Sequence, residues 1–125
     1  MKILSSLIIL ALASCSNVVT PPPAPKTSAQ VVFESKAAEG AALTIFIRYK
    51  ALPSCAPPTH PAICSDQNVV TRVQQADIVA AKAIDTAETA VRTPGFGTSA
   101  IQTMLAAAQA AVGVLTNSTS SLRVQ

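Results

Sequence analysis

Residues 69–92 read VVTRVQQADIVAAKAIDTAETAVR, and this stretch decides the fold class. Small or apolar residues recur in it every three or four positions, the spacing that gathers side chains on one face of an α-helix. The recurring positions are Val69, Val73, Ala76, Ala80, Ala83, Ala87 and Ala90. Ser65 or Asp66 is a suitable N-cap, so we expect a helix that ends near Arg92. Its buried stripe is predicted to comprise Val73, Ala76, Ala80, Ala83 and Ala87, small side chains that let a neighbouring helix come close.

A second helix is predicted before this stretch, beginning after Thr27. Thr27 and Gln30 have the spacing of a capping box, and Pro53 ends the segment. The residues expected on its buried face are Val31, Ala38, Ala42, Ile45, Tyr49 and Leu52. Residues 43–49 also alternate and are rich in β-branched side chains, which is typical of a strand. A helix is favoured because no second convincing strand is available to pair with this one.

A third helix is predicted after the Thr93-Pro94-Gly95-Phe96-Gly97 turn. Ser99 and Gln102 have the spacing of another capping box. The expected buried face is Ile101, Leu105, Ala108, Val112 and Leu115. The predicted fold class is therefore all-α, a small three-helix up-down-up bundle over residues 28–117 with a flexible tail over residues 118–125. Its core is expected to be thin, because alanine is abundant and aromatic residues make up 3% of the chain.

The N-terminus has the features of an export signal. Met1-Lys2 precedes an apolar segment, Ile3 to Ala13, which is too short for the roughly 20 residues that a bilayer span needs. The segment ends in Leu12-Ala13-Ser14-Cys15, which closely resembles the lipobox of bacterial lipoproteins. The resemblance implies cleavage after Ser14, so that residues 1–14 are a signal peptide, and lipid attachment to Cys15. Ser16 in place of aspartate at the next position implies the outer membrane, periplasmic side.

Residues 15–27 are predicted to be a spacer between the lipid and the bundle. Pro21, Pro22, Pro23 and Pro25 favour extended polyproline II, at about 3.1 Å per residue. Residues 16–27 would then reach roughly 35 Å from the membrane.

Once Cys15 is assigned to lipid, Cys55 and Cys64 remain as an even pair in an exported chain. Oxidising compartments favour a disulfide between such cysteines. The alternative is a metal site in which His60 joins the two cysteines, with Asp66 nearby as a fourth candidate ligand. The disulfide is favoured because a structural zinc site usually has four ligands and tighter cysteine spacing.

The sequence offers little for catalysis. It has one histidine and none of the nucleophile-elbow, P-loop or dinucleotide-binding motifs. The carboxylate pairs Glu34/Glu39 and Asp85/Glu88 fit solvated helix faces better than a glycosidase site. The net charge is +3, and the basic residues are scattered along the sequence rather than clustered as in a nucleic-acid-binding surface. We expect no enzyme activity, no cofactor, no resident metal and no nucleic-acid partner.

Beyond Cys15 the chain is similar to small lipoproteins of proteobacterial genomes and prophages, a resemblance carried by Leu52 to Arg92. It implies a lipid-anchored envelope protein with a structural or interaction role, whose partners are the membrane, an envelope protein or a second copy. The alternative is a phage-derived envelope effector, acting in lysis like the spanins or in superinfection exclusion. The proline-rich linker resembles that of spanins, whereas the long helical body departs from their pattern.

Overall fold

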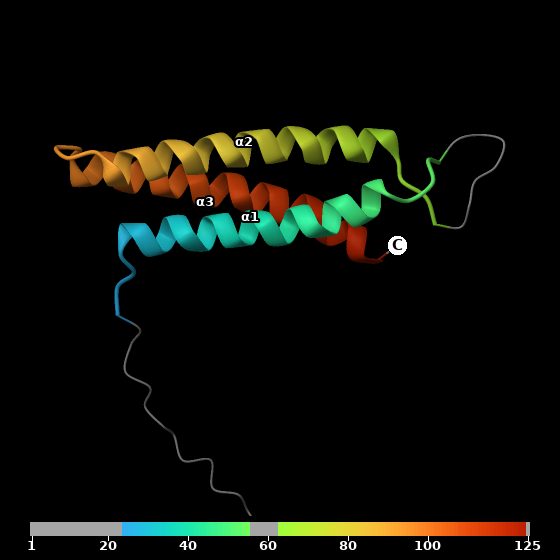
Figure 1. Ribbon diagram of the computed structural model, residues 1–125, viewed down its shortest axis with the longest axis horizontal. Coiled ribbons are helices and arrows are strands. Elements are labelled where there is room, and N and C mark those ends of the chain that lie inside the picture. Colours follow the sequence, from blue (N-terminus) through green and yellow to red (C-terminus); the bar gives the residue numbers. More distant parts are fainter. Residues whose placement is uncertain (1–23, 56–62, 125) are drawn as a thin grey trace, which may run out of the picture.

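The structure is a computed structural model, and it describes residues 24–55 and 63–124. Three α-helices make up its body, α1 (Ser28–Lys50), α2 (Gln67–Arg92) and α3 (Thr98–Ser120), and a short 3-10 helix, η1 (Ser121–Val124), follows. α1 and α3 run in one direction and α2 runs back between them in the chain order, so the predicted up-down-up bundle is confirmed (Figure 1). Residues 43–49 belong to α1, and the strand alternative is wrong.

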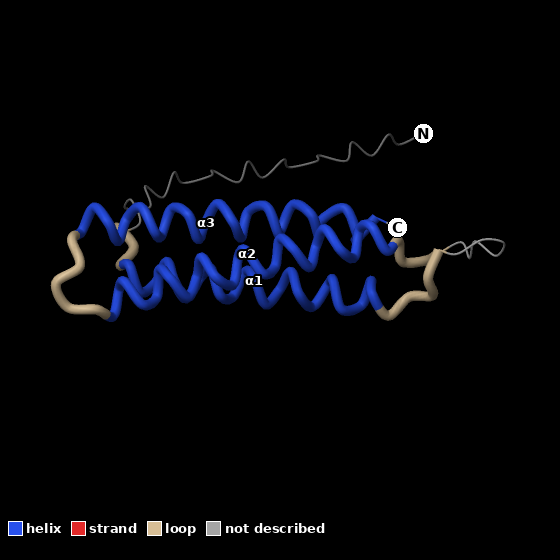
Figure 2. Tube along the Cα trace, turned by 90° about the horizontal axis from the view of Figure 1, so that it is seen from above, coloured by secondary structure: helices blue, strands red, loops and turns tan. Residues whose placement is uncertain are grey.

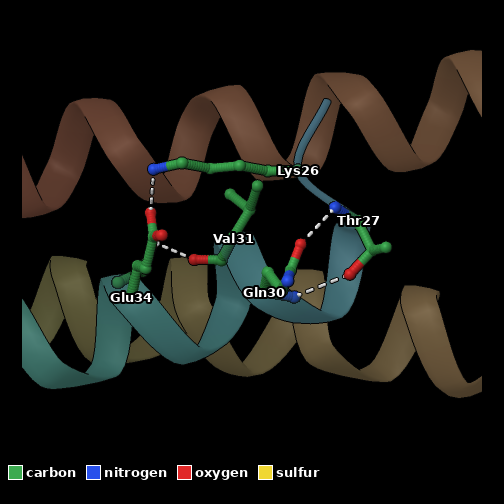
Figure 3. Close-up of polar contacts among 6 residues, drawn as sticks. Lys26, Thr27, Gln30, Val31 and Glu34 are labelled. Atoms are coloured by element: carbon green, nitrogen blue, oxygen red, sulfur yellow. Dashed lines mark hydrogen bonds and ion pairs between the residues drawn. The ribbon is translucent and has the colours of Figure 1, made fainter. Parts of the chain in front are cut away.

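The start of α1 is fixed by the predicted capping box (Figure 3). The backbone N–H of Thr27 donates to Gln30 Oε1 at 2.8 Å, and the backbone N–H of Gln30 donates to Thr27 Oγ1 at 3.3 Å. Lys26 Nζ also reaches Glu34 Oε2 at 2.5 Å. The two capping hydrogen bonds satisfy backbone donors that a helix start leaves free, and they set the direction in which the chain enters the bundle.

α2 begins at one of the two predicted caps, because Asp66 Oδ1 accepts from the backbone N–H of Asn68 at 2.7 Å. The start of α3 differs from the prediction. The helix begins at Thr98 with Gly97 as N-cap and without a side-chain cap, so Ser99 lies inside the first turn and forms no capping box with Gln102. Glycine is an accepted N-cap residue, and Gly95, with φ of 86°, makes the preceding turn possible.

The buried face of α3 includes four of its five predicted residues, Leu105, Ala108, Val112 and Leu115. On α2 the stripe is rotated from the prediction. Ile84 is 1% exposed and lies between Ala80 and Ala87 on the helix face, whereas Ala76 and Ala83 are only partly buried. The reason is geometric, because positions 80, 84 and 87 follow the 3.6-residue period about the centre of the face and position 83 falls at its edge.

The buried face of α1 includes the predicted Ala42 and Tyr49 but differs from the prediction elsewhere. Val32 and Phe46 are buried, while Val31 and Ile45 pack from the side. Phe46 and Tyr49 add bulk at the end of the bundle where α1 leads into α2. Near the middle of each helix the buried side chain is an alanine, at Ala42, Ala80 and Ala108. The expected thin core is therefore present at these positions.

The helical domain continues past the predicted boundary at residue 117. Thr119 is 1% exposed, and its hydroxyl donates to the carbonyl oxygens of Leu115 and Thr116 at 3.1 Å. Leu122 of η1 is buried in the same core as the helices. The Thr119 hydroxyl competes for backbone carbonyls, a contact that can disturb a helix. The helical structure nevertheless continues, because Thr119 and Leu122 bury surface on the bundle. Residues 118–122 thus belong to the bundle and not to a flexible tail.

Candidate functional site

Cys15 and His60 lie outside the described residues. The lipidation site and the histidine of the metal alternative are therefore judged from the sequence. The other two predicted site residues, Cys55 and Cys64, lie at the connection between α1 and α2 (Figure 1).

Cys55 and Cys64 form the predicted disulfide, with their Cα atoms 5.1 Å apart. Both sulfur atoms are joined to each other, so neither is a thiolate that could bind a metal in this state. Among the described residues, no three histidine, cysteine, aspartate or glutamate side chains gather as a possible metal site. The disulfide reading is thus the one that the structure supports for this pair.

Backbone hydrogen bonds beside the disulfide join the segment after α1 to the segment before α2. The N–H of Cys55 donates to the carbonyl of Ser65 at 3.1 Å, and the N–H of Ser65 donates to the carbonyl of Pro53 at 2.8 Å. The buried Ser65 hydroxyl donates to the carbonyl of Leu52 at 3.1 Å. These bonds make the bundle end a compact clamp, which we call the disulfide clamp, comprising residues 52–55 and 64–66.

Tyr49 ties this clamp to the helices. Its hydroxyl oxygen accepts from the backbone N–H of Asp66 at 2.8 Å, while its ring is buried in the core. Sequence reasoning placed Tyr49 on the buried face but missed this role of its hydroxyl. A signal existed, because a buried tyrosine usually finds a partner for its hydroxyl group, although the sequence did not indicate which partner.

Each of the two carboxylate pairs lies on a single helix, Glu34 and Glu39 on α1 and Asp85 and Glu88 on α2. Glu34 pairs with Lys26, and Glu88 pairs with both Lys36 and Arg92, so α1 and α2 are joined by an ion pair. The hydrogen bond from Lys36, with help from Arg92, lowers the pKa of Glu88 below its ordinary value. Glu34 and Glu88 are thus part of a charged helix surface.

Glu39 has the opposite environment. Partial burial, followed by the nearby charges of Asp77 and Asp85 on α2, raises its pKa above the ordinary value. Asp77 Oδ1 is buried and has no hydrogen-bond partner among the described residues. The negative charges of Asp77 and Asp85 on α2 therefore make ionisation of Glu39 on α1 less favourable.

Shallow grooves run between neighbouring helices. One of about 520 Å³ lies between α2 and α3 and is mainly apolar, lined by Ile78, Val79, Lys82, Ala83, Thr86, Met104 and Ala107. A second, of about 500 Å³, continues from it to the turn, where Phe96 is 41% exposed. Another groove, of about 320 Å³, lies between α1 and α3 beside Gly113. None of these grooves is enclosed in the way that a small-molecule pocket usually is.

The chain matches no protein-family model, no curated protein and no solved structure. Among the described residues, one helix, α3, has the length and apolar character of a possible membrane span, with a mean hydropathy of 1.3. One such helix is weak evidence for a membrane span, and α3 contributes Leu105, Val112 and Leu115 to the core of the bundle. The function is therefore argued from the sequence motif and from the placement of the clamp.

Proposed function

We propose that this protein is a lipid-anchored envelope lipoprotein whose helical domain serves a structural or protein-interaction role. The observation that carries the proposal is Leu12-Ala13-Ser14-Cys15 at the end of a short apolar export signal. A diacylated cysteine with a further acyl chain on its amino group holds a protein on a membrane stably, because two chains already suffice. On this proposal the sulfur of Cys15 carries the lipid, and the domain acts on the periplasmic side of the outer membrane.

The two ends of the bundle support different roles in this proposal. α1 begins at the end that also holds the α2–α3 turn, and the disulfide clamp lies at the opposite end (Figures 1 and 2). α2 has 26 residues, so the ends are about 39 Å apart at 1.5 Å per residue. A linker from Cys15 to Thr27 therefore joins the membrane to the turn end and leaves the clamp as the distal end.

The distal end is the better candidate for contact with another protein. The disulfide and the Tyr49–Asp66 hydrogen bond restrain the backbone there, and a restrained surface loses less conformational entropy on binding. The exposed Ile63, beside Cys64, supplies an apolar side chain at the same end.

One experiment tests both the lipid anchor at Cys15 and which end of the bundle faces the membrane. Cys15→Ala should abolish incorporation of a fatty-acid probe and release the protein from membranes. Photo-crosslinking residues placed at Ser54, in the clamp, and at Thr98, beside the turn, should then differ in intact cells. We expect protein adducts from Ser54 and more lipid adducts from Thr98. Labelling and membrane retention that persist in Cys15→Ala would reject the anchor, and identical adducts from both positions would reject the orientation.

A further inference from the structure

One side of the bundle gathers apolar side chains that the core leaves exposed. Ile78 and Val79 of α2 are 66% and 59% exposed, and Phe96 of the α2–α3 turn is 41% exposed. Ile78 and Val79 line the same groove as Met104 and Ala107 of α3, and Met104 also lines the adjoining groove that reaches Phe96. We call these five residues the groove face. Adjoining exposed apolar side chains indicate a contact surface, whereas single ones do not.

The groove face lies in the half of the bundle that is nearer to the proposed anchor. Ile78 and Val79 are in the middle of α2 (Gln67–Arg92), and Phe96 lies beyond its last residue. α1 begins at this same end of the bundle, and the disulfide clamp is at the other (Figures 1 and 2). A linker that enters α1 at Thr27 therefore keeps the groove face close to whatever holds Cys15.

The linker is also long enough to let the groove face reach the membrane. The residues that line the two adjoining grooves come from α2, the turn and α3, so these grooves face away from α1. Two layers of helices, each about 10–12 Å across, separate the start of α1 from that side. Residues 16–27 reach roughly 35 Å when extended, which exceeds this thickness of about 20 Å.

The chemistry of the groove face fits a lipid surface. Both grooves are shallow and open, so their apolar residues can meet a broad surface at once. Lys82 lines both grooves, and Asp85 lines only the one beside the turn. A lysine at the edge of an apolar surface can lay its methylene stem along that surface while its ammonium group reaches lipid phosphates.

We propose that the groove face docks on the membrane that holds Cys15, with Ile78, Val79 and Phe96 at the boundary between headgroups and acyl chains. Amphipathic surfaces of this kind bury their apolar side about 5–10 Å into that boundary. The inference rests on the proposed lipid anchor and adds a second contact with the same bilayer. Tethering makes the docking step intramolecular, so a small apolar contact suffices. The disulfide clamp then remains free to meet proteins.

The first test places a photoreactive diazirine residue at Ile78 or at Phe33 of the full chain in cell envelopes. Phe33 is the matched control, because it is an apolar residue near the same end of the bundle, is 73% exposed and belongs to α1. Mass spectrometry should find several-fold more phospholipid adducts at Ile78 than at Phe33. Equal lipid adducts at both positions, or mainly protein adducts at Ile78, including a dimer of this chain, would overturn the docking.

The second test changes the groove face and keeps the anchor. Ile78→Asp together with Val79→Asp should lower the lipid adducts from a diazirine at Ala107 several-fold, because charged side chains resist burial in lipid. Ile47→Asp, at an α1 residue that is 64% exposed, should leave these adducts unchanged. Circular dichroism and fatty-acid labelling should be the same in both variants. Adducts at Ala107 that survive the double substitution would overturn the role of this face.

Defined vesicles separate the docking from the anchor. With Cys55 and Cys64 in their disulfide, Cys15 is the remaining cysteine of the chain, so its thiol can be joined to a maleimide lipid. The chain from Cys15 onward, tethered in this way to vesicles of phosphatidylethanolamine and phosphatidylglycerol, should repeat the contrast between Ile78 and Phe33. Loss of the contrast in these vesicles would overturn the docking. The contrast in vesicles without fatty-acid labelling in cells would reject the anchor alone.

Discussion

The hydroxyl oxygen of Tyr49, at the end of α1, accepts a 2.8 Å hydrogen bond from the backbone N–H of Asp66, the N-cap residue of α2. This one contact joins the end of one helix to the start of the next across 17 residues of sequence. Helix starts leave backbone donors unsatisfied, and a donor that is removed from water without a partner destabilises the fold. The geometry of the clamp therefore depends on a side chain of the core.

Tyr49→Phe should lower the free energy of unfolding by about 1 kcal/mol, because the ring stays in the core while the Asp66 N–H loses its acceptor. Urea unfolding followed by circular dichroism measures the change. Thr71→Val is the control, since the exposed Thr71 hydroxyl bonds only to a carbonyl of its own helix. A Tyr49→Phe protein as stable as the unsubstituted one would show that the hydrogen bond contributes nothing.

The double variant Cys55→Ser, Cys64→Ser should be less stable by about 2.7 kcal/mol, the chain-entropy value for a loop of about ten residues. The expected cause is the greater freedom of the unfolded chain, so the helical content of the folded state should be unchanged. Denaturant midpoints of the variant and of the oxidised protein give the difference. Equal midpoints would mean that Tyr49 and the Ser65 hydrogen bonds hold the clamp without help from the disulfide.

Ala80→Leu and Ala83→Leu should differ, although the sequence pattern treats the two positions alike. Ala80 is 0% exposed at the centre of the α2 face, so extra methyl groups there would overpack the core at a cost of about 1–3 kcal/mol. Ala83 borders the α2–α3 groove, where a larger side chain has room, and its change should be under about 0.5 kcal/mol. Thermal unfolding of both variants measures the contrast, and equal losses would contradict the orientation of α2.

Glu39→Gln should stabilise the protein at pH 7. Burial, Asp77 and Asp85 raise the pKa of Glu39 in the folded state above its ordinary value of 4.5, so the ionised form is less favourable in the folded than in the unfolded chain. The protonated folded form is favoured below pH 4.5, and this advantage is lost as the pH rises through the folded pKa. The gain from Glu39→Gln should therefore be largest at neutral pH and should shrink below pH 4.5.

Glu88→Gln is the matched control for that pH profile, with the opposite sign. Its pKa is lowered by Lys36 and Arg92, so its ionised form contributes stability above pH 4.5 that is lost as the pH falls through the folded value. The variant should be less stable at pH 7 and equal to the unsubstituted protein in acid. Thermal midpoints from pH 3 to pH 8 measure both profiles, and profiles of the same sign would contradict the assigned environments.

The sequence predicted the helices well because each follows a 3.6-residue period and lies between clear breakers. The buried face of α3 was predicted almost completely, since its leucines and valines stand out from alanine. On α2 the prediction was right for Val73, Ala80, Ala87 and Ala90, but it missed Ile84, because the alanines at 76, 80, 83 and 87 left the centre of the face undefined. Ile84 is the larger side chain that occupies that centre.

Of the candidate site, only the disulfide could be predicted from the sequence. With Cys15 assigned to lipid, two cysteines remain, which predicted the Cys55–Cys64 disulfide that the structure contains. The hydrogen bonds of Tyr49 and Ser65 could not be derived, because their partners are distant in sequence and are set by how α1 and α2 pack. The same holds for Glu39, whose raised pKa depends on two carboxylates of the neighbouring helix.

The most direct test of the lipid anchor is mass spectrometry of the amino-terminal peptide of the protein extracted from membranes. We expect a peptide that begins at Cys15 and carries a diacylglyceryl group on the sulfur and an acyl chain on the amino group. A peptide that begins at Met1, or one that contains Cys15 without lipid, would contradict it.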